Sequence, residues 1–217
     1  MRIEQGDFVE LDYLAKIKDT GDVFDLTNED KAKELNLYNK NIKYNPIIIC
    51  VGKGDVISGL DEFLIGKELG NFNVELIPEK AFGKKRTDLI KLINTNILRK
   101  QKIDPMPGLK INIDGLMGAI ISVSGGRTLI DFNHPLAGKS VVYEITIKKI
   151  ITDLNDKVSG ILKLYLTKNP EFELKNDELT IKFKKIHDNF KKFLEELVTQ
   201  RLPEIRKITF QETTTGE

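Results

Sequence analysis

The chain has 217 residues, of which 40% are hydrophobic and 31% are charged, a balance typical of a folded globular protein rather than a disordered or fibrous one. Every apolar run is shorter than the ~18 residues that cross a bilayer, and the N-terminus has no signal-peptide pattern. A single cysteine, Cys50, excludes an intrachain disulfide, so we expect a cytoplasmic protein. The net charge of +1 gives no reason to expect a nucleic-acid partner.

Charge is unevenly distributed along the chain. Residues 84–130 carry nine basic and three acidic side chains, whereas the flanking segments 1–83 and 131–150 together carry 13 basic and 18 acidic ones. Residues 151–217 carry 12 of each kind. Asymmetry of this kind indicates separate structural units, so we expect the basic segment to form a unit of its own.

Short strands and one helix are predicted in the first 83 residues. From Val9 to Ile17 apolar and polar side chains alternate with a period of two, which predicts a strand with one buried face. Leu60, Phe63 and Leu64 have the spacing of a short amphipathic helix that ends at Gly66. Further extended segments are expected at 23–25, 46–51 and 71–76, with a polar loop of one or two helical turns at 28–45.

The basic segment begins with residues 84–108, to which the pattern assigns no element and which end in the turn signal Asp104-Pro105-Met106-Pro107-Gly108. Two later apolar runs are separated by Gly125-Gly126, and such a pair favours a hairpin with a primed turn. Elements are expected at 109–113, 116–124, 127–132, 141–148, 158–165, 179–184, 186–201 and 205–212. Together they predict an α+β fold.

Residue types argue against several classes of site. Gly52-Lys53-Gly54 lacks the spacing of a phosphate-binding loop. Two histidines and one cysteine argue against a metal centre, and a triad that used His134 would lack the Gly-x-Ser-x-Gly elbow. We therefore expect no cofactor and no metal ion.

Five blocks of sequence, in order and in register, resemble the FKBP family of peptidyl-prolyl cis-trans isomerases. The blocks are Tyr13, Gly21-Asp22-Val23-Phe24-Asp25, the segment from Pro46 to Leu60, the segment from Gly70 to Gly83, and the strand that reaches Tyr143. The resemblance implies an FKBP-type antiparallel sheet with a short helix, built from residues 1–83 and 131–150. It also implies isomerisation of X-Pro bonds in unfolded or nascent polypeptides.

The insertion at 84–130 narrows this resemblance to the SlyD-like branch, in which a small, mainly β chaperone domain is inserted in the flap and binds unfolded chains. Residues 151–217 resemble the C-terminal α/β domain of long archaeal FKBP-type chaperones, which is associated with dimers, so a homodimer through 151–217 is expected. The tail at 211–217 is not rich in His or Cys, so the nickel-linked role of bacterial members is not expected. Candidate chain-binding residues are Met106, Leu109, Ile111, Leu116, Met117, Ile120 and Ile121.

The resemblance also implies a prolyl pocket lined by apolar and aromatic side chains. The lining residues are Tyr13, Phe24, Ile47, Val56, Ile57, Leu60, Phe82, Leu136 and Tyr143, with His134 nearby. The Ile57 N–H would hold a substrate carbonyl, and Asp25, held by Tyr13, would polarise the twisting amide. We expect Tyr13, Asp25, Ile57, Phe82 and Tyr143 to act in catalysis and the others to bind substrate. Such a site needs no nucleophile and no proton transfer, because rotation requires only that the amide lose its resonance.

Other interpretations stay open at this point. Phe82, Leu60 and Tyr143 stand where the family commonly has tyrosine, tryptophan and phenylalanine, and we expect activity to survive with an altered sequence preference. Without the resemblance, Tyr13, Val56, Leu60 and Tyr143 would be interpreted as plain core. A catalytically inactive FKBP-fold binding module is one alternative function. An RNA-binding factor is another, although residues 84–130 contain no aromatic side chain on which a base could stack.

Overall fold

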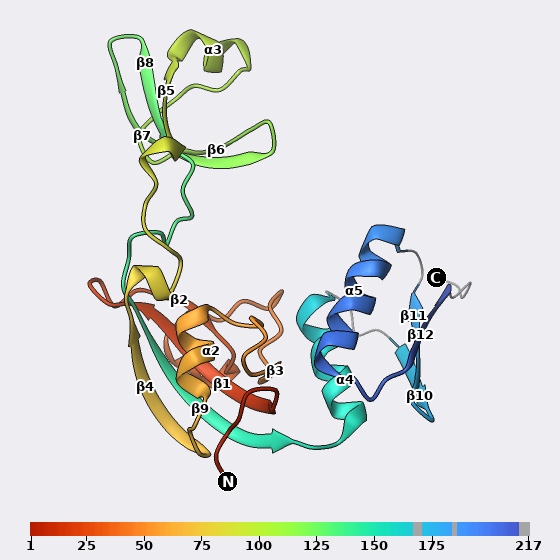
Figure 1. Ribbon diagram of the computed structural model, residues 1–217. Helices are drawn as coiled ribbons and strands as arrows, with labels where there is room; N and C mark the ends of the chain where they lie inside the picture. Colours follow the sequence, from red (N-terminus) through yellow and green to blue (C-terminus); the bar gives the residue numbers. More distant parts are fainter. Residues whose placement is uncertain (167–170, 184–185, 213–217) are drawn as a thin grey trace. The chain divides into compact units, whose positions relative to one another are not determined.

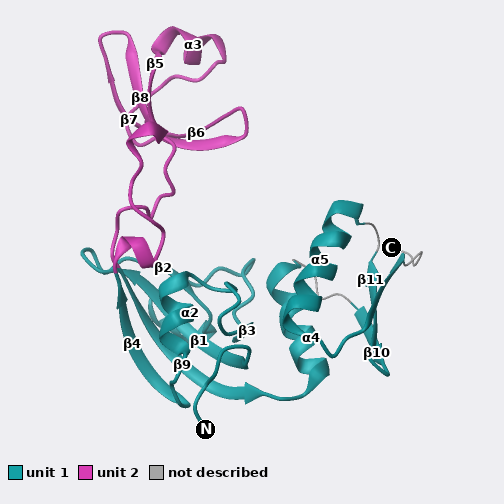
Figure 2. Cartoon of the chain, in the orientation of Figure 1, with its two compact units in different colours: residues 1–76, 141–217 teal, residues 77–140 magenta. Residues whose placement is uncertain are grey.

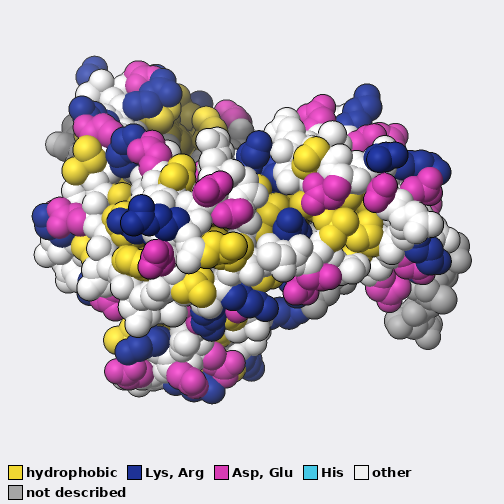
Figure 3. All heavy atoms as spheres, turned by 60° about the horizontal axis from the view of Figure 1, so that its bottom comes forward, with side chains coloured by type: hydrophobic (Ala, Val, Ile, Leu, Met, Phe, Trp, Pro, Cys, Tyr) yellow, Lys and Arg dark blue, Asp and Glu magenta, His cyan; other side chains and the backbone are white. Residues whose placement is uncertain are grey.

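The computed structural model describes residues 1–166, 171–183 and 186–212. Residue 184, at the end of one predicted strand, and the tail 213–217 lie outside the described residues. The chain divides into two compact units, one formed by residues 1–76 with 141–217 and the other by residues 77–140 (Figure 2). Basic and acidic side chains are interspersed over the face shown in Figure 3.

An antiparallel five-stranded sheet forms the centre of the first unit (Figure 1). Strand β1 (Phe8–Ile17) pairs with β9 (Val141–Ile151) on one side and with β2 (Val23–Leu26) and β3 (Ile47–Cys50) on the other, and β4 (Gly70–Leu76) pairs with β9. Helix α1 (Glu29–Glu34) follows β2, and α2 (Ser58–Leu64) lies against one face of the sheet. The α+β class and these predicted elements are confirmed.

One end of β1 is buried on both faces of the sheet. Phe8 and Val9 are adjacent and point to opposite faces, yet their exposed fractions are 1% and 0%. Phe8 packs with Cys50 and Ile151 in a hydrophobic cluster that also contains residues of the C-terminal segment. The alternation rule predicts one buried face here, and the second is buried because the C-terminal segment covers it.

The described residues between 151 and 212 form an α/β segment that packs on this end of the sheet. Helix α4 (Leu154–Tyr165) precedes β10 (Glu171–Lys175) and β11 (Glu178–Phe183), and α5 (Asp188–Arg201) connects β11 to the parallel strand β12 (Lys207–Glu212). Helix α4 packs closely on β3, because a Cβ atom at Gly160 would lie 2.6 Å from Ile48. The prediction missed β10, in which two apolar side chains alternate with three charged ones.

The second unit has a sheet and a core of its own. Its strands follow the order β5 (Ile90–Asn94), β8 (Arg127–Asp131), β7 (Leu116–Ser124) and β6 (Lys110–Ile113), with α3 (Thr95–Lys100) after β5. Short 3-10 turns η1 (Pro78–Lys80) and η2 (Thr87–Leu89) precede β5. The φ angles of Gly125 and Gly126 are +56° and +73°, which confirms the primed hairpin. The buried core of the second unit contains Leu98, Ile111, Ile120 and Ile130.

Candidate active site

An aromatic group lies on one face of β1, β2 and β9. Ala15 of β1 pairs with Asp25 on one side and with Tyr143 on the other. Tyr13 lies two residues away on the same face, because side chains alternate along a strand. The ring centroids of Tyr13 and Tyr143 are 5.6 Å apart, and those of Phe24 and Tyr143 are 6.1 Å apart in an edge-to-face arrangement. The small side chain of Ala15 leaves room for these rings to meet.

A carboxylate is fixed at the edge of this aromatic group. The Tyr13 hydroxyl donates a hydrogen bond of 2.7 Å to Asp25 Oδ2, and the Asp25 side chain is exposed. Burial, together with the negative charge of Asp25, holds the pKa of Tyr13 far above its usual value, and the same two causes raise the pKa of Tyr143. Both phenols therefore stay protonated near neutral pH, and Tyr13 acts as a donor to Asp25.

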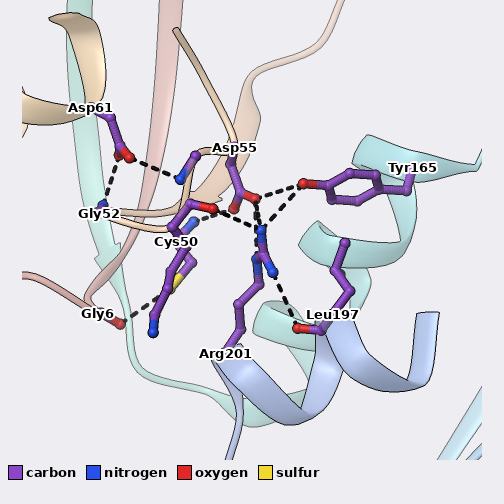
Figure 4. Close-up of polar contacts among 10 residues, drawn as sticks. Gly6, Cys50, Gly52, Asp55, Asp61, Tyr165, Leu197 and Arg201 are labelled. Carbon is purple, nitrogen blue, oxygen red and sulfur yellow. Dashed lines mark hydrogen bonds and ion pairs between the residues drawn. The ribbon is translucent and has the colours of Figure 1, made fainter. Parts of the chain in front are cut away.

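The loop between β3 and α2 is held by two carboxylates (Figure 4). Asp61 accepts hydrogen bonds from the N–H groups of Gly52 and Gly54 at 2.7 and 2.9 Å. Asp55 Oδ2 accepts a hydrogen bond of 2.8 Å from the Cys50 N–H. These bonds fix the backbone that leads directly into Val56 and Ile57.

Ile57 precedes α2 and has an extended backbone, with φ −58° and ψ 146°. Its carbonyl accepts hydrogen bonds from the N–H groups of Leu60 and Asp61, so the start of α2 is anchored on it. Among the described residues, the Ile57 N–H has no acceptor. This N–H is available to a carbonyl group of a ligand. Leu60 is 1% exposed on the first turn of α2.

Of the remaining predicted residues, Phe82, His134 and Leu136 belong to the second unit and Ile47 belongs to the first. In the second unit, the rings of Phe82 and His134 stack with centroids 4.8 Å apart and planes within 3° of parallel. The Leu136 N–H donates to His134 Nδ1 at 3.2 Å, and the Gly138 N–H donates to the Gly83 carbonyl, which brings these two segments together. Ile47, in β3 of the first unit, borders a cavity of about 700 Å³ that α4 also lines.

Sequence reasoning missed the residues that hold the loop at 50–57. Asp55 and Asp61 follow the glycines of the loop, and this pattern of an acid close to a glycine turn is a usable signal for carboxylates that bind loop N–H groups. Arg201, which contacts Asp55, is 146 residues away in sequence and gives no local signal.

Family comparisons identify the class of the chain. The model described as FKBP-type peptidyl-prolyl cis-trans isomerase matches residues 1–97, and the model described as FKBP26, IF domain matches residues 91–136. A short-type peptidyl-prolyl cis-trans isomerase of Methanocaldococcus jannaschii is 34% identical over 149 residues, which cover 68% of this chain and 94% of that protein. The chain belongs to the FKBP-type peptidyl-prolyl cis-trans isomerase family. The resemblance inferred from the five blocks is thereby confirmed.

Other FKBP-type relatives include SlyD of Vibrio cholerae, which is 27% identical over 165 residues that cover 73% of this chain and 74% of that protein. This similarity supports the SlyD-like assignment. Among solved structures, the three FKBP domains of wheat FKBP73 align with a TM-score of 0.37 and 17% identity, over 70% of this chain and 42% of that chain. No helix in the described part of this FKBP-type chain is long and apolar enough to cross a membrane.

Proposed function

We propose that this FKBP-type isomerase binds unfolded polypeptide on its second unit and isomerises X-Pro bonds at the aromatic group of Tyr13, Phe24, Asp25 and Tyr143. The single observation that carries the catalytic part is the Tyr13–Asp25 hydrogen bond at the edge of the packed rings. A planar amide resists rotation by ~18–20 kcal/mol because of its resonance. An apolar aromatic surface favours the twisted amide, which has lost this charge separation.

Asp25 and Ile57 have complementary roles in this proposal. The Ile57 N–H holds a carbonyl of the substrate, and the Asp25 carboxylate faces the twisting amide from the rim. Neither group gives up or takes a proton. Both contribute only through their fixed positions beside the substrate. Phe82, His134 and Leu136 stay predictions as pocket residues.

The catalytic part is tested by Asp25→Ala in the intact chain with a short X-Pro peptide. We expect kcat/KM to fall about tenfold, because a preorganised charge near the reacting group is lost. Asp22→Ala is the matched control, since Asp22 is an exposed aspartate between β1 and β2 whose carboxylate accepts a hydrogen bond from the Thr20 hydroxyl and none from Tyr13. Equal activity of both variants and the unaltered chain would contradict the role of Asp25.

Chain binding by the second unit rests on its exposed apolar side chains. Leu116 is 63% exposed and Met117 is 59% exposed, and Met106 and Ile121 are exposed as well. Of the candidates from the sequence, Ile111 and Ile120 belong instead to the unit's own core. Exposed apolar surface next to β6, an outer strand of the sheet, suits an unfolded chain that adds as a further strand.

The test is the affinity of the intact chain for a permanently unfolded protein. We expect the double variant Leu116→Ser with Met117→Ser to bind about tenfold more weakly, because it loses apolar surface from the contact. Leu69→Ser is the control, since Leu69 lies in the first unit and is 52% exposed. Equal weakening by both variants would remove the second unit from the proposal.

A homodimer through 151–217 remains a proposal on a different ground. Most of the apolar stripe of α5, which suggested pairing, is covered within the chain, because Leu194, Leu197 and Val198 are buried, whereas Phe193 is 42% exposed. The outer strands β10 and β12 of the C-terminal sheet and the exposed side chain of Phe193 are surfaces that support pairing. A sedimentation coefficient that does not change with concentration and corresponds to a monomer would contradict it.

A further inference from the structure

A buried ion pair joins the C-terminal segment to the loop before α2 (Figure 4). Arg201 Nη2 lies 2.6 Å from Asp55 Oδ1, and the exposed fractions of the two side chains are 6% and 0%. Arg201 Nε donates to the same oxygen at 3.1 Å, and the Tyr165 hydroxyl donates to it at 2.8 Å. Both oxygens of the Asp55 carboxylate therefore accept hydrogen bonds, Oδ1 from donors on α4 and α5 and Oδ2 from the Cys50 N–H at the end of β3.

Arg201 also binds the backbone of the loop directly. Its Nη2 donates to the Lys53 carbonyl at 3.1 Å, while Nη1 donates to the Leu197 carbonyl on its own helix at 3.3 Å. The planar guanidinium thus spans from α5 to two residues of the loop, which a compact ammonium group cannot do in the same geometry. Because buried charges need partners, removal of Arg201 would leave the Asp55 carboxylate without its countercharge.

This contact lies immediately before the residues that face the substrate. Asp55 is followed directly by Val56 and Ile57, and Asp55 Oδ2 also accepts the Cys50 N–H across the loop. A loop released at Asp55 would therefore change the position of the Ile57 N–H. We propose that Arg201 is a positioning residue for prolyl isomerisation, through which the C-terminal segment fixes the loop that presents Ile57. This inference rests on the proposed function of Ile57.

A merely structural role makes a different kinetic prediction. If Arg201 only stabilised the fold, its loss would reduce the amount of active protein, which lowers kcat and leaves KM unchanged. If it positions the loop, the substrate must order a loosened backbone when it binds, which raises KM. The KM and kcat values for a short X-Pro peptide therefore separate the two roles.

The experiment compares Arg201→Met, Arg201→Lys and Arg206→Met in the full chain. Arg206 is the matched control, because it lies in the same segment and its ion pair with Asp177 is on the surface. We expect Arg201→Met to raise KM about tenfold with kcat within twofold, Arg201→Lys to recover part of this loss, and Arg206→Met to change neither constant. An unchanged KM in Arg201→Met would overturn the proposal.

A second measurement keeps this inference separate from the proposed function. Hydrogen exchange of the Gly52 and Gly54 amides, which are held by Asp61 and not by Asp55, reports whether the whole loop loosens. We expect exchange about tenfold faster in Arg201→Met than in Arg206→Met. If the unaltered chain fails to isomerise peptides, the proposed function is wrong, whereas unchanged exchange in Arg201→Met refutes the positioning role on its own.

Discussion

The substitution Tyr13→Phe isolates the hydrogen bond that orients Asp25. It removes one hydroxyl, whose oxygen lies 2.7 Å from Asp25 Oδ2, and keeps the ring that packs against Tyr143. A hydrogen bond to a charged group contributes about 1.5–3 kcal/mol. Because Asp25 is exposed, water replaces part of this interaction, and about 1 kcal/mol remains as the loss. That energy corresponds to about a fivefold decrease in kcat/KM.

The assay is the cis-to-trans rate of a short X-Pro peptide at several enzyme concentrations. Tyr44→Phe is the control, because the Tyr44 hydroxyl accepts a hydrogen bond from the Asn39 N–H in the loop at 28–45. Full activity of Tyr13→Phe would refute the view that Asp25 must be held in one orientation. A loss of about a hundredfold or more would also refute it, because that is the range of general acid catalysis.

Three further outcomes are expected. Gly160→Ala should destabilise the fold by about 1–3 kcal/mol in denaturant unfolding, because the new Cβ would lie 2.6 Å from Ile48. Ser159→Ala, on the same helix, serves as the control. Equal stability of the two variants would contradict the close packing of α4 on β3. Burial, together with the neighbouring Asp55, raises the pKa of Tyr165 to about 12. The stability that this shift contributes is complete below pH ~10, the usual tyrosine pKa, and is lost as the pH rises toward 12. Tyr165→Phe should therefore flatten the decline of the free energy of unfolding above pH ~10, and an unchanged decline would contradict this expectation. Leu98→Ala should destabilise the second unit by about 2–5 kcal/mol, because Leu98 is 1% exposed in that unit's own core. The variant should bind an unfolded protein more weakly while it still isomerises a short peptide. Loss of both activities would contradict the independence of the two units.

The fold was predictable wherever a long segment repeats one period. The ten-residue alternation of β1 and the apolar stripe of α5 each predicted an element that the structure contains. The short elements β5, α3 and β10 were missed, because no pair of glycine or proline turn signals bounds them, as Pro46 and Gly52 bound the equally short β3. The Gly-Gly hairpin needed only two residues, since positive φ angles at both positions are a specific requirement of the primed turn.

The candidate site was predictable only as far as the family resemblance reached. Tyr13 and Asp25 are 12 residues apart, and their hydrogen bond follows from the register of β1 and β2, which the sequence pattern alone does not define. Arg201 lies far from the blocks that carry the resemblance, and its contact with Asp55 depends on how α5 packs against the loop. Contacts of this kind arise from tertiary packing, so no local pattern predicts them.

The division of labour between the two units is tested most directly by a comparison of two substrates in one variant. The intact chain and the Leu116→Ser, Met117→Ser double variant are each given a short X-Pro peptide and an unfolded protein whose refolding is limited by proline isomerisation. We expect an unchanged rate on the peptide and about a tenfold slower rate on the protein, because only the second substrate depends on a high local concentration. An equal decrease on both substrates, or no decrease on either, would contradict the claim that one unit binds the chain and the other isomerises it.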